Sequence, residues 1–527
     1  MIKINEVCVS IEENENPENL QGVIANFLNI KIESVLNYKI LKRALDARKK
    51  QNIHYKYNLA VEIEEKQLKK LMNKYHFSEY IEEQKIINKV NKNKAVAIIG
   101  SGPAGLFSAL TLAKSGIEVF VLERGDNVEN RVKIVNELLN NGKFNNKTNI
   151  QFGEGGAGTF SDGKLNTGIK SELIKEVLNE FCLAGANENI LYDAKPHIGT
   201  DVLRKVIKNL REKIISLGGK FLFNSQFVDF EKINNKIQVS YINENVYKKL
   251  LVDDLVLATG YSARDTIRML FEKGIQFKQK AFSVGYRIEH KQENVNISQY
   301  GENYNKKLPP ADYKLFTHLK NGRTVYTFCM CPGGEVVPAM SEEGQIVTNG
   351  MSYNARSGLN ANSAVLVSVG PEDYESDHPL AGIKFQEKLE SSAFEKGCGK
   401  FIVSIVDDFL KNKSTTKLND VIPTIKPCYV LGDVSKLLPE ELSESIKEGI
   451  IEFGKKMPAF KDKSAVLTGI ETRSSAPFMI VRDDDFQTNI RNIYAVGEGA
   501  GMAGGIVSSA VDGMKIADKI IQKYIGN

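Results

Sequence analysis

Residues 95–124, AVAIIGSGPAGLFSALTLAKSGIEVFVLER, combine an apolar run, a glycine cluster, a helix-like stretch and a second apolar run that ends at Glu123. The run AVAII is suited to a parallel strand that is buried on both faces. Gly100 and Gly102 allow a tight turn and a close approach of the backbone to a pyrophosphate, while Gly105 lets the next helix pack on the strand. The phosphates are then expected at the positive end of that helix. The stretch therefore predicts a nucleotide site in an α/β fold.

Glu123 ends the second predicted strand. A carboxylate at this place accepts hydrogen bonds from both ribose hydroxyls of an adenosine, and it repels a 2'-phosphate. The alternative is a glycine-rich turn in some other α/β protein, because a lone GxGxxG motif is weak evidence. Strand, helix and acidic strand end together favour the nucleotide, and they leave NAD and FAD open.

Three further segments bear on the choice between the two nucleotides. DDLVLATGYSAR (253–264) reads as a buried strand that ends in Ala-Thr-Gly, QFGEGGAGTFSDGKLNT (151–167) is a second glycine loop, and 492–518 reads as a strand, a glycine turn and a helix. One nicotinamide nucleotide has no use for so many sites of close backbone approach. The segments resemble the later contact elements of the glutathione-reductase-like FAD superfamily. The resemblance implies FAD, with Glu498 as the acidic residue that reaches the ribityl chain.

The expected cofactor-binding residues are drawn from these segments. They are Gly100, Gly102, Pro103, Ala104, Gly105, Glu123, Arg124, Gly155, Gly156, Gly158, Ser161, Lys164, Ala258, Thr259, Gly260, Gly497, Glu498, Gly504, Gly505 and Ile506. Ser161 and Lys164 are the polar candidates near the flavin ring, and a solvated lysine is the other interpretation of Lys164.

A helix that begins at Gly504-Gly505-Ile506 would offer free backbone N–H groups and a positive dipole end to the charge that develops near flavin N1 and the C2 carbonyl on reduction. The alternative is that these glycines serve only close helix packing, since both roles need small residues.

A finer resemblance covers nearly the whole chain. It rests on the strings at 194–201, 327–352, 360–369, 471–482 and 497–506, among them TFCMCPGGEVVPAMSEEGQIVTNGMS and GEGAGMAGGI. They are similar to a bacterial family of FAD-dependent dehydrogenases, or NAD(P)/FAD-dependent oxidoreductases, whose substrate is unassigned and which carry an FAD-dependent C-terminal domain. The family also has a small amino-terminal βαββ-like domain. The resemblance implies a flavoprotein oxidoreductase.

Composition sets wider bounds. The 527 residues, 42% of them hydrophobic, suffice for two or three domains. The net charge of +5 comes from 70 basic and 65 acidic residues mixed along the chain, so charge gives no sign of a nucleic-acid partner. No stretch approaches the roughly 20 apolar residues of a membrane helix, and the first residues lack the apolar core of a signal peptide. Six scattered cysteines fit a reduced compartment, and a cytoplasmic location is expected.

The expected fold class is α/β: a Rossmann-like, discontinuous FAD-binding domain, an inserted mixed α+β substrate domain, and a small N-terminal βαββ domain. Its boundaries are 1–75 for the N-terminal domain, 76–94 for a helical linker, 95–280 and 491–527 for the two parts of the FAD domain, and 281–490 for the inserted domain. The expected N-terminal elements are strands at 2–10, 36–47 and 53–64 and a helix at 17–29. In the inserted domain a hairpin turns at Asn321-Gly322.

Four residues are candidates for catalysis. Cys329 and Cys331 could exchange electrons or contact substrate, or they could be two small residues on one face of a strand. His197 is a possible general acid, with a structural histidine as the alternative. Arg473 could bind a substrate carboxylate or the pyrimidine edge of the flavin, and an ion pair inside the substrate domain is the alternative. No metal site is expected, because no second pair of cysteines or histidines completes four ligands.

Three functions remain open at this stage. The first is an FAD-dependent dehydrogenase or reductase of a small organic substrate, with hydride transfer through flavin N5 and NAD(P)H as a transient electron donor. The second is a monooxygenase of the hydroxylase type, suggested by the Thr259-Gly260-x-Ser262-x-Arg264 turn. The third is a flavin-bearing binding protein without catalysis. The sequence leaves the substrate and the oligomeric state open.

Overall fold

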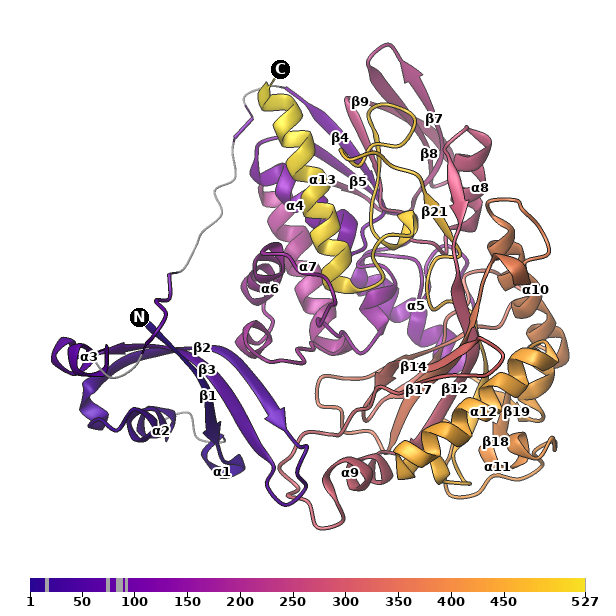
Figure 1. Ribbon diagram of the computed structural model, residues 1–527. Coiled ribbons are helices and arrows are strands. Elements are labelled where there is room, and N and C mark those ends of the chain that lie inside the picture. The colour runs from indigo at the N-terminus through magenta and orange to yellow at the C-terminus, as the bar shows by residue number, and fades with distance from the viewer. Residues whose placement is uncertain (15–18, 73–75, 82–88, 91–92, 527) are drawn as a thin grey trace.

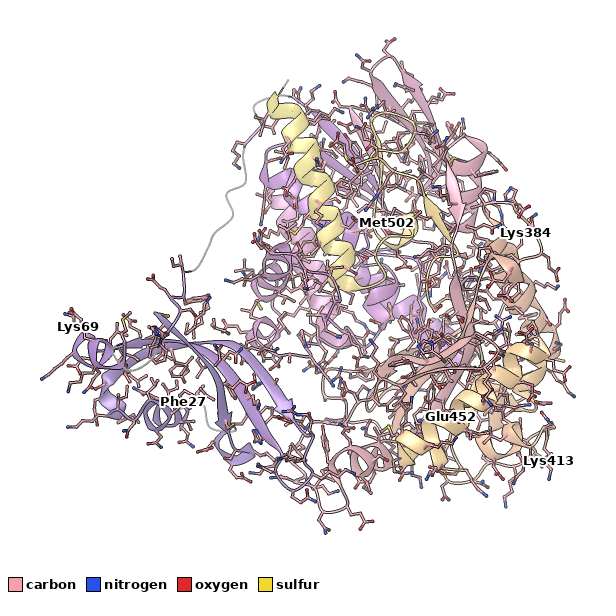
Figure 2. All side chains as sticks on the ribbon, in the orientation of Figure 1. Phe27, Lys69, Lys384, Lys413, Glu452 and Met502 are labelled. Carbon is pink, nitrogen blue, oxygen red and sulfur yellow. The ribbon has the colours of Figure 1, made fainter. Side chains whose placement is uncertain are left out.

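A computed structural model describes residues 1–14, 19–72, 76–81, 89–90 and 93–526 (Figure 1). The N-terminal part is a three-stranded antiparallel sheet in the order β1-β3-β2. Its elements are β1 (Ile2–Val9), α1 (Ile11–Asn14), α2 (Asn19–Leu28), β2 (Val35–Asp46) and β3 (His54–Ile63). Helix α2 turns Leu20, Ile24 and Leu28 toward the sheet and leaves Phe27 outside (Figure 2). The predicted βαββ order is present, although residues 17–18 of the expected helix lie outside the described residues.

The described residues of the predicted helical linker are not helical. Helix α3 (Glu65–Met72) lies before it, and the linker residues that the structure describes, 76–81, 89–90 and 93–94, contain no helix. Instead Ser78 and Tyr80 bond to the edge of β1, with Lys3 N–H donating to Ser78 O at 2.8 Å and Tyr80 N–H to Met1 O at 2.9 Å. The free edge of β1 offers the hydrogen bonds that this segment uses. The rest of the linker lies outside the described residues.

The nucleotide half is built on a five-stranded parallel sheet in the order β22-β10-β4-β5-β6. The strands are β4 (Ala95–Ile99), β5 (Glu118–Leu122), β6 (Lys220–Leu222), β10 (Asp254–Leu257) and β22 (Ile493–Ala495). The central strands β4 and β10 and the neighbouring β22 are buried on both faces, as expected for parallel strands between two layers, whereas the edge strand β6 is partly exposed.

Helices cover one face of this sheet and a small antiparallel sheet covers the other (Figure 1). The helices are α4 (Pro103–Lys114), α6 (Leu173–Leu183), α7 (Thr200–Ser216) and α13 (Ile506–Gly526). The other layer contains β7 (Ser225–Ile233), β8 (Lys236–Asn243), β9 (Val246–Val252) and α8 (Arg264–Glu272). Helix α5 (Val128–Asn141) packs beside α7. Because β22 and α13 come from the end of the chain, the nucleotide half is discontinuous, as predicted.

The inserted part is a seven-stranded mixed sheet in the order β13-β14-β17-β12-β20-β18-β19, antiparallel except for the last pair. The strands are β12 (Phe282–Lys291), β13 (Phe316–His318), β14 (Thr324–Cys331), β17 (Asn360–Val369), β18 (Phe401–Ile405), β19 (Tyr429–Leu431) and β20 (Val466–Glu471). Its helices are α9 (Gln292–Tyr300), α10 (Ala381–Lys396), α11 (Val406–Leu410) and α12 (Glu440–Lys456), and β15 (Glu335–Pro338) pairs with β16 (Thr348–Met351). The β13–β14 hairpin turns at Asn321-Gly322, where Gly322 has φ +83°.

The chain returns to the nucleotide half before the expected boundary at residue 490. Strand β21 (Phe478–Ile480) pairs with β11 (Phe277–Gln279), and Ala476, Phe478 and Ile480 pack in the core beneath the parallel sheet. The predicted fold class is confirmed by this architecture. Among the residues described, no helix is long and apolar enough to span a membrane.

Candidate functional site

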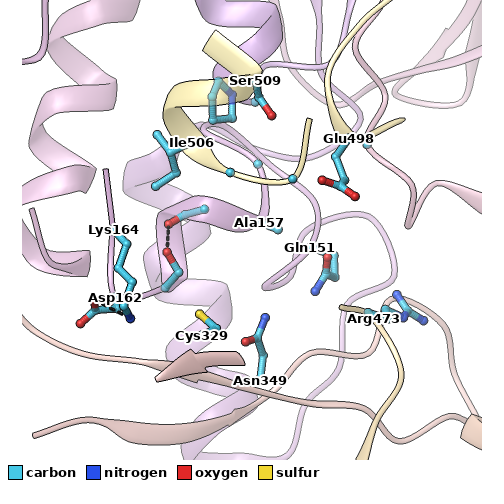
Figure 3. Close-up of a pocket in the computed structure, with 18 of the residues that line it drawn as sticks. Gln151, Ala157, Asp162, Lys164, Cys329, Asn349, Arg473, Glu498, Ile506 and Ser509 are labelled. Atoms are coloured by element: carbon cyan, nitrogen blue, oxygen red, sulfur yellow. Dashed lines mark hydrogen bonds and ion pairs between the residues drawn. The ribbon is translucent and has the colours of Figure 1, made fainter. Parts of the chain in front are cut away.

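A cavity of about 850 Å³ lies between the parallel sheet and the inserted sheet (Figure 3). One end is formed by the glycine turn after β4, and the other end by β14, β16 and the end of β20. A volume of this size is typical of ligand sites that enclose a cofactor or drug-sized molecule. The cavity therefore joins the two halves that the sequence predicted on either side of an active site.

Most of the predicted cofactor residues line this cavity. They are Gly100, Gly102, Pro103, Ala104, Glu123, Arg124, Gly156, Gly158, Ser161, Lys164, Ala258, Thr259, Gly260, Glu498, Gly504, Gly505 and Ile506. Gly105, Gly155 and Gly497 are not in the lining. Each supports the cavity wall from behind, because a Cβ atom would overlap Gly100 O at Gly105, Thr159 Oγ1 at Gly155, and Ala104 Cβ at Gly497.

The first glycine turn lies at the start of α4 and leaves the first backbone N–H groups of the helix uncovered. Gly102 caps α4 without a side-chain hydrogen bond and Pro103 occupies the first helical position. The first N–H groups of a helix have no partner within the helix, and the helix dipole is positive there. Gly100, with φ +103°, passes so close to Ala258 O that a side chain would not fit. The turn thus leaves the helix end open to a phosphate, as the motif predicted.

Glu123 has more partners than the sequence suggested. Its Oε2 accepts from Ser101 N at 3.0 Å and Ser101 Oγ at 2.7 Å, and its Oε1 accepts from Gly125 N at 2.9 Å and Gly153 N at 3.2 Å. The carboxylate thus ties both glycine loops to the end of β5. A carboxylate has about four acceptor positions, so a ribose would have to share them. The ribose contact stays a proposal.

A buried arginine shapes the second glycine loop. Arg131 on α5 is fully buried and donates to six oxygen atoms in the loop. The acceptors are the carbonyls of Asn149, Ile150, Gly153, Glu154 and Gly156 and the Thr159 hydroxyl. Neither the charge pattern nor the glycine spacing indicated this arginine, because its partners are all backbone or hydroxyl oxygens.

The start of α13 corrects one expectation. Gly505 N–H does not face the cavity freely, because it donates to Ser508 Oγ at 3.0 Å. The first helical residues Ile506 and Val507 carry the N–H groups that the helix itself leaves without acceptors. The positive end of the helix still adjoins the cavity through Gly504, Gly505 and Ile506. The free backbone N–H groups expected at Gly504 and Gly505 are therefore expected at Ile506 and Val507 instead.

Glu498 reaches into the cavity from η7 (Glu498–Ala500) (Figure 3). Its Oε1 accepts from Ala476 N at 3.0 Å, while no described residue donates to Oε2. Burial raises the pKa of this carboxyl. A Cβ at Gly504 would lie 2.8 Å from Oε2, so the absence of a side chain there gives the carboxylate its room.

Lys164 is not a solvated lysine. Its ammonium pairs with Asp162 Oδ2 at 2.9 Å and donates to Met330 O on β14. Asp162 also binds Arg356, with Nη2 to Oδ2 at 2.5 Å. These contacts join the second glycine loop to the inserted sheet at the bottom of the cavity.

The two cysteines have different environments. Cys329 lines the cavity, whereas Cys331 is fully buried, and a register shift in the β14–β17 pairing separates them. Both thiols are free. The expectation that they share one face of a regular strand is wrong, because Cys329 has φ +44° in a β-bulge.

Arg473 lines the cavity but is engaged inside the protein. Its Nη2 lies 2.9 Å from Glu390 Oε2, its Nε donates to Glu390 Oε1 at 3.2 Å, and Nη1 donates to Ser341 Oγ at 2.6 Å. Arg473 thus forms the ion pair inside the inserted domain that the sequence left as the alternative. Arg264, taken from the hydroxylase-like turn, binds the same Glu390 at 2.8 Å and does not line the cavity.

His197 does not line the cavity either. Its Nε2 is 3.2 Å from Asn354 O, and burial lowers its pKa. This arrangement favours the structural interpretation of the histidine.

Several lining residues were missed by the sequence reasoning. Asn349 and Glu471 line the part of the cavity beside Cys329, called the chamber below, and Gln151 and Ser101 are further lining residues. Asn349 and Glu471 stood inside the strings that carried the resemblance, which is the signal that could have pointed to them.

A nucleotide-binding sheet with two glycine loops, joined by one cavity to an inserted sheet, is the architecture of a flavoprotein. Residues 94–297 match the family described as pyridine nucleotide-disulphide oxidoreductase, residues 281–474 match FAD-dependent protein, C-terminal domain-like, and residues 1–62 match a domain of unknown function (DUF8436). The site residues fit FAD, because a Cβ at Gly156 would lie 3.1 Å from Gly102 Cα and a Cβ at Gly504 would lie 2.8 Å from Glu498 Oε2, so these glycines keep the cavity open, and Glu498 offers a free oxygen.

The chain is 44% identical over 534 residues, 99% of both chains, to an uncharacterized protein of Clostridium beijerinckii. It therefore belongs to the same family, which is one of FAD-dependent oxidoreductases with the FAD-dependent C-terminal domain. A ribosomal RNA dihydrouridine synthase of Haemophilus influenzae is 28% identical over 167 residues, 31% of this chain and 39% of that protein.

Solved structures of flavoproteins are more distant matches. The halogenase PltM in complex with phloroglucinol and FAD is 11% identical with a TM-score of 0.40, over 82% of this chain and 70% of that chain. A flavoprotein/dehydrogenase from Cytophaga hutchinsonii is 12% identical with a TM-score of 0.36, over 83% and 80%.

Proposed function

We propose that this FAD-dependent protein is a dehydrogenase or reductase of a small organic substrate. The observation that carries the proposal is the continuity of the cavity, which runs from the glycine turn at Gly100 to the chamber at Cys329, Asn349 and Glu471. When bound, FAD supplies hydride transfer through its N5 atom. The protein's own part is to hold the nucleotide at one end and to orient a substrate in the polar chamber at the other.

The residues that would hold FAD divide by position along the cavity. The end of α4 and the glycines before it would meet the pyrophosphate, and Glu123 would meet the adenosine ribose. Glu498 would accept hydrogen bonds from the ribityl hydroxyls at its free Oε2. The end of α13 would face the flavin ring, where its positive dipole favours negative charge.

The chamber side chains would orient the substrate. Asn349 points into the cavity (Figure 3), and its Oδ1 accepts from Gly350 N at 2.8 Å while no described residue accepts from its amide N–H groups. Lys164 adds a cation, although it is paired with Asp162. These groups fit a substrate that carries a carbonyl or carboxylate. NAD(P)H would deliver electrons as a transient ligand of the same cavity.

The test is anaerobic reduction of the purified, FAD-loaded protein by NADH, by NADPH and by a panel of metabolites. The loss of flavin absorbance measures the reduction. Bleaching by a metabolite, or by NAD(P)H followed by reoxidation with one, supports the proposal. In a parallel assay under air, NAD(P)H consumption with stoichiometric oxygenation of a substrate would instead identify a monooxygenase. Bleaching by dithionite alone would identify a flavin-bearing binding protein.

A matched pair of variants makes the test specific to the chamber. Asn349→Ala should keep FAD and slow flavin reduction by the active metabolite, because it removes a group that would orient substrate. Asn166→Ala changes another asparagine of the lining, which is exposed in the second glycine loop, and should have the smaller effect. Equal rates in wild type and Asn349→Ala would argue against this placement of the substrate.

A further inference from the structure

Gln151 turns an unpaired carboxamide NH2 group into the cavity. The residue is only 8% exposed, although it belongs to the cavity lining. Its Oε1 accepts from Ser262 Oγ at 3.0 Å, and no described residue accepts from Nε2. Figure 3 shows the side chain pointing into the cavity. A buried donor without an acceptor costs free energy, so a ligand that accepts from Nε2 would stabilise the site.

The backbone that carries this side chain is held in place. Gln151 N–H donates to Asn149 Oδ1 at 2.8 Å, and the buried Arg131 donates to the carbonyls of Asn149 and Ile150. Ser262, which orients the carboxamide, lies in the turn after β10. The direction of the Gln151 amide is therefore set before a ligand binds, which lowers the entropic cost of binding.

Asn349 on β16 carries a second unpaired NH2 group. Its Oδ1 accepts from the backbone N–H of Gly350 at 2.8 Å, and this contact identifies the oxygen, because a backbone N–H can only donate. Among the described residues, none accepts from Nδ2, and the side chain points into the cavity (Figure 3). Gln151 and Asn349 thus offer hydrogen-bond donors to the same cavity.

Two charged side chains that also line the chamber have partners within the protein. Both carboxylate oxygens of Glu471 accept from Arg287, at 3.1 and 3.2 Å. The ammonium of Lys164 pairs with Asp162 and donates to Met330 O. The two carboxamides therefore provide the open hydrogen-bonding groups, and these groups are donors. A ligand bound to them must supply acceptors.

The charge at the bottom of the cavity favours an anionic ligand. Asp162 is shared by two cations, Lys164 with Nζ–Oδ2 at 2.9 Å and Arg356 with Nη2–Oδ2 at 2.5 Å. One positive charge of this cluster is therefore not balanced by Asp162, whereas Glu471 and Arg287 balance each other. An unbalanced cation in a partly buried site attracts negative charge. A carboxylate, which is planar and only accepts hydrogen bonds, fits both the charge and the donors.

We propose that Gln151 and Asn349 hold the carboxylate group of the substrate. This inference rests on the proposed function and deepens it, because it names the class of substrate, a small carboxylic acid in its ionised form. Each carboxamide donates an N–H group to the carboxylate, and the cluster around Lys164 adds attraction over a longer range. The two residues orient the substrate and take no part in the transfer of electrons.

Benzoate and benzamide provide the test on the oxidised, FAD-loaded protein. The two molecules have nearly the same planar shape, but benzamide is neutral and carries an NH2 group in place of one acceptor oxygen. Titration calorimetry without any reductant gives the dissociation constant of each, so that binding and not turnover is measured. Wild type should bind benzoate about tenfold or more tightly than benzamide, because hydrogen bonds to a charged acceptor are the stronger ones.

Gln151→Glu and Asn349→Asp replace each NH2 group by an oxygen and keep the shape of the side chain. Each should weaken benzoate binding about tenfold or more. Benzamide binding should stay equal or become tighter, since a carboxylate accepts from its NH2 group. Asn166→Asp is the matched control, because Asn166 is an exposed residue of the same lining and receives the same charge. Gln151→Met removes the donor without adding a charge and should also weaken benzoate binding.

Three results would overturn the proposal, provided that FAD content shows the protein to be folded. One is wild type that binds benzoate no more tightly than benzamide. Another is benzoate binding in the folded Gln151 and Asn349 variants that equals binding in Asn166→Asp. The third is a loss of FAD affinity in Gln151→Glu with unchanged benzoate binding in Asn349→Asp, which would assign Gln151 to the cofactor.

The outcomes for this inference and for the proposed function differ. A clear preference for benzoate, together with a flavin that neither a metabolite nor NAD(P)H reduces, would contradict the proposed function alone. Flavin reduction by a metabolite without a carboxylate, in a protein that does not prefer benzoate, would contradict the carboxylate site alone.

Discussion

Arg473 and Glu390 form a buried, two-pronged ion pair, with Nη2–Oε2 at 2.9 Å and Nε–Oε1 at 3.2 Å. Arg264 binds the other side of the same carboxylate through Nη1 and Nη2 at 2.8 and 2.9 Å. All three side chains are almost wholly excluded from solvent. One carboxylate from α10 thus joins the segment after β20 to the start of α8, which belongs to the nucleotide half.

Glu390→Gln should destabilise the protein by about 3–5 kcal/mol, because it leaves two buried guanidinium groups without their shared counter-ion. Burial alone would raise the pKa of Glu390, but Arg264 and Arg473 outweigh it and lower the pKa to about 2. A carboxyl whose pKa is lowered on folding stabilises fully above its unfolded pKa near 4.5, and this stabilisation is lost as the pH falls toward 2.

Urea unfolding of wild type and Glu390→Gln between pH 8 and pH 3 measures this dependence. The difference in free energy of unfolding should stay constant above about pH 5 and shrink below it. Glu387→Gln is the control, since Glu387 lies on the same helix and pairs with the more exposed Arg268. If Glu390→Gln has the same free energy of unfolding as Glu387→Gln, the ion pair between Arg473 and Glu390 has no structural role.

Local sequence predicted the elements better than the contacts between them. The glycine turn, the buried strands and the discontinuous sheet followed from apolar runs and glycine spacing, which are properties of neighbouring residues. The partnership of Arg473 with Glu390 could not be predicted this way, because 83 residues separate the two and only the packing of α10 against the end of β20 brings them together. The same holds for Arg287 with Glu471, which are 184 residues apart.

Glu123→Ala should lower the affinity for FAD about tenfold or more. A hydrogen bond to a charged group contributes roughly 1.5–3 kcal/mol, and this carboxylate also holds Ser101, Gly125 and Gly153 in place around the cavity. The dissociation constant is measured by the recovery of flavin fluorescence on release. Glu118→Ala is the control at the other end of β5, where the carboxylate pairs with Lys220 near the surface. Full FAD occupancy and an unchanged dissociation constant in Glu123→Ala would place the ribose elsewhere.

Glu154→Gln should flatten the pH dependence of stability near neutrality. Burial raises the pKa of Glu154 to about 7, although Arg211 Nη1 lies 2.7 Å from Oε2, and no described residue donates to Oε1. A carboxyl with a raised folded pKa contributes its stabilisation below the unfolded pKa near 4.5 and loses it as the pH rises through about 7.

Each unit of pKa difference between the folded and unfolded states corresponds to about 1.4 kcal/mol of folding free energy. The free energy of unfolding that is lost through Glu154 as the pH rises is therefore about 3 kcal/mol at most. Thermal or urea unfolding of wild type and Glu154→Gln at pH 5, 6, 7 and 8 measures it. The wild type should lose stability relative to the variant as the pH rises across this range. Parallel curves would show that Glu154 is ionised throughout.

The site shows a second limit of sequence reasoning, at the level of single hydrogen bonds. The glycines before α13 were expected to offer their N–H groups to the flavin, but Ser508 on the first turn of the helix takes the N–H of Gly505. The bulge at Cys329 is hidden in the same way, because a strand-like string does not reveal a register shift that its partner strand imposes. Such details depend on side chains that face one another only after folding.

Gly504 and Gly505 give the sharpest test of the end of α13. A Cβ at Gly504 would lie 2.8 Å from Glu498 Oε2, so Gly504→Ala must displace the carboxylate that reaches into the cavity, whereas a Cβ at Gly505 would lie 3.4 Å from Ser508 Oγ and needs little adjustment. Gly504→Ala should therefore lose FAD or bind it with a changed reduction potential, and Gly505→Ala should stay closer to wild type. For a two-electron couple, about 1.4 kcal/mol corresponds to roughly 30 mV. FAD content and potentiometric titration of the two variants measure the difference. Native content and native potential in Gly504→Ala would show that this segment does not adjoin the flavin, and the second half of the FAD site would then have to be sought elsewhere in the cavity.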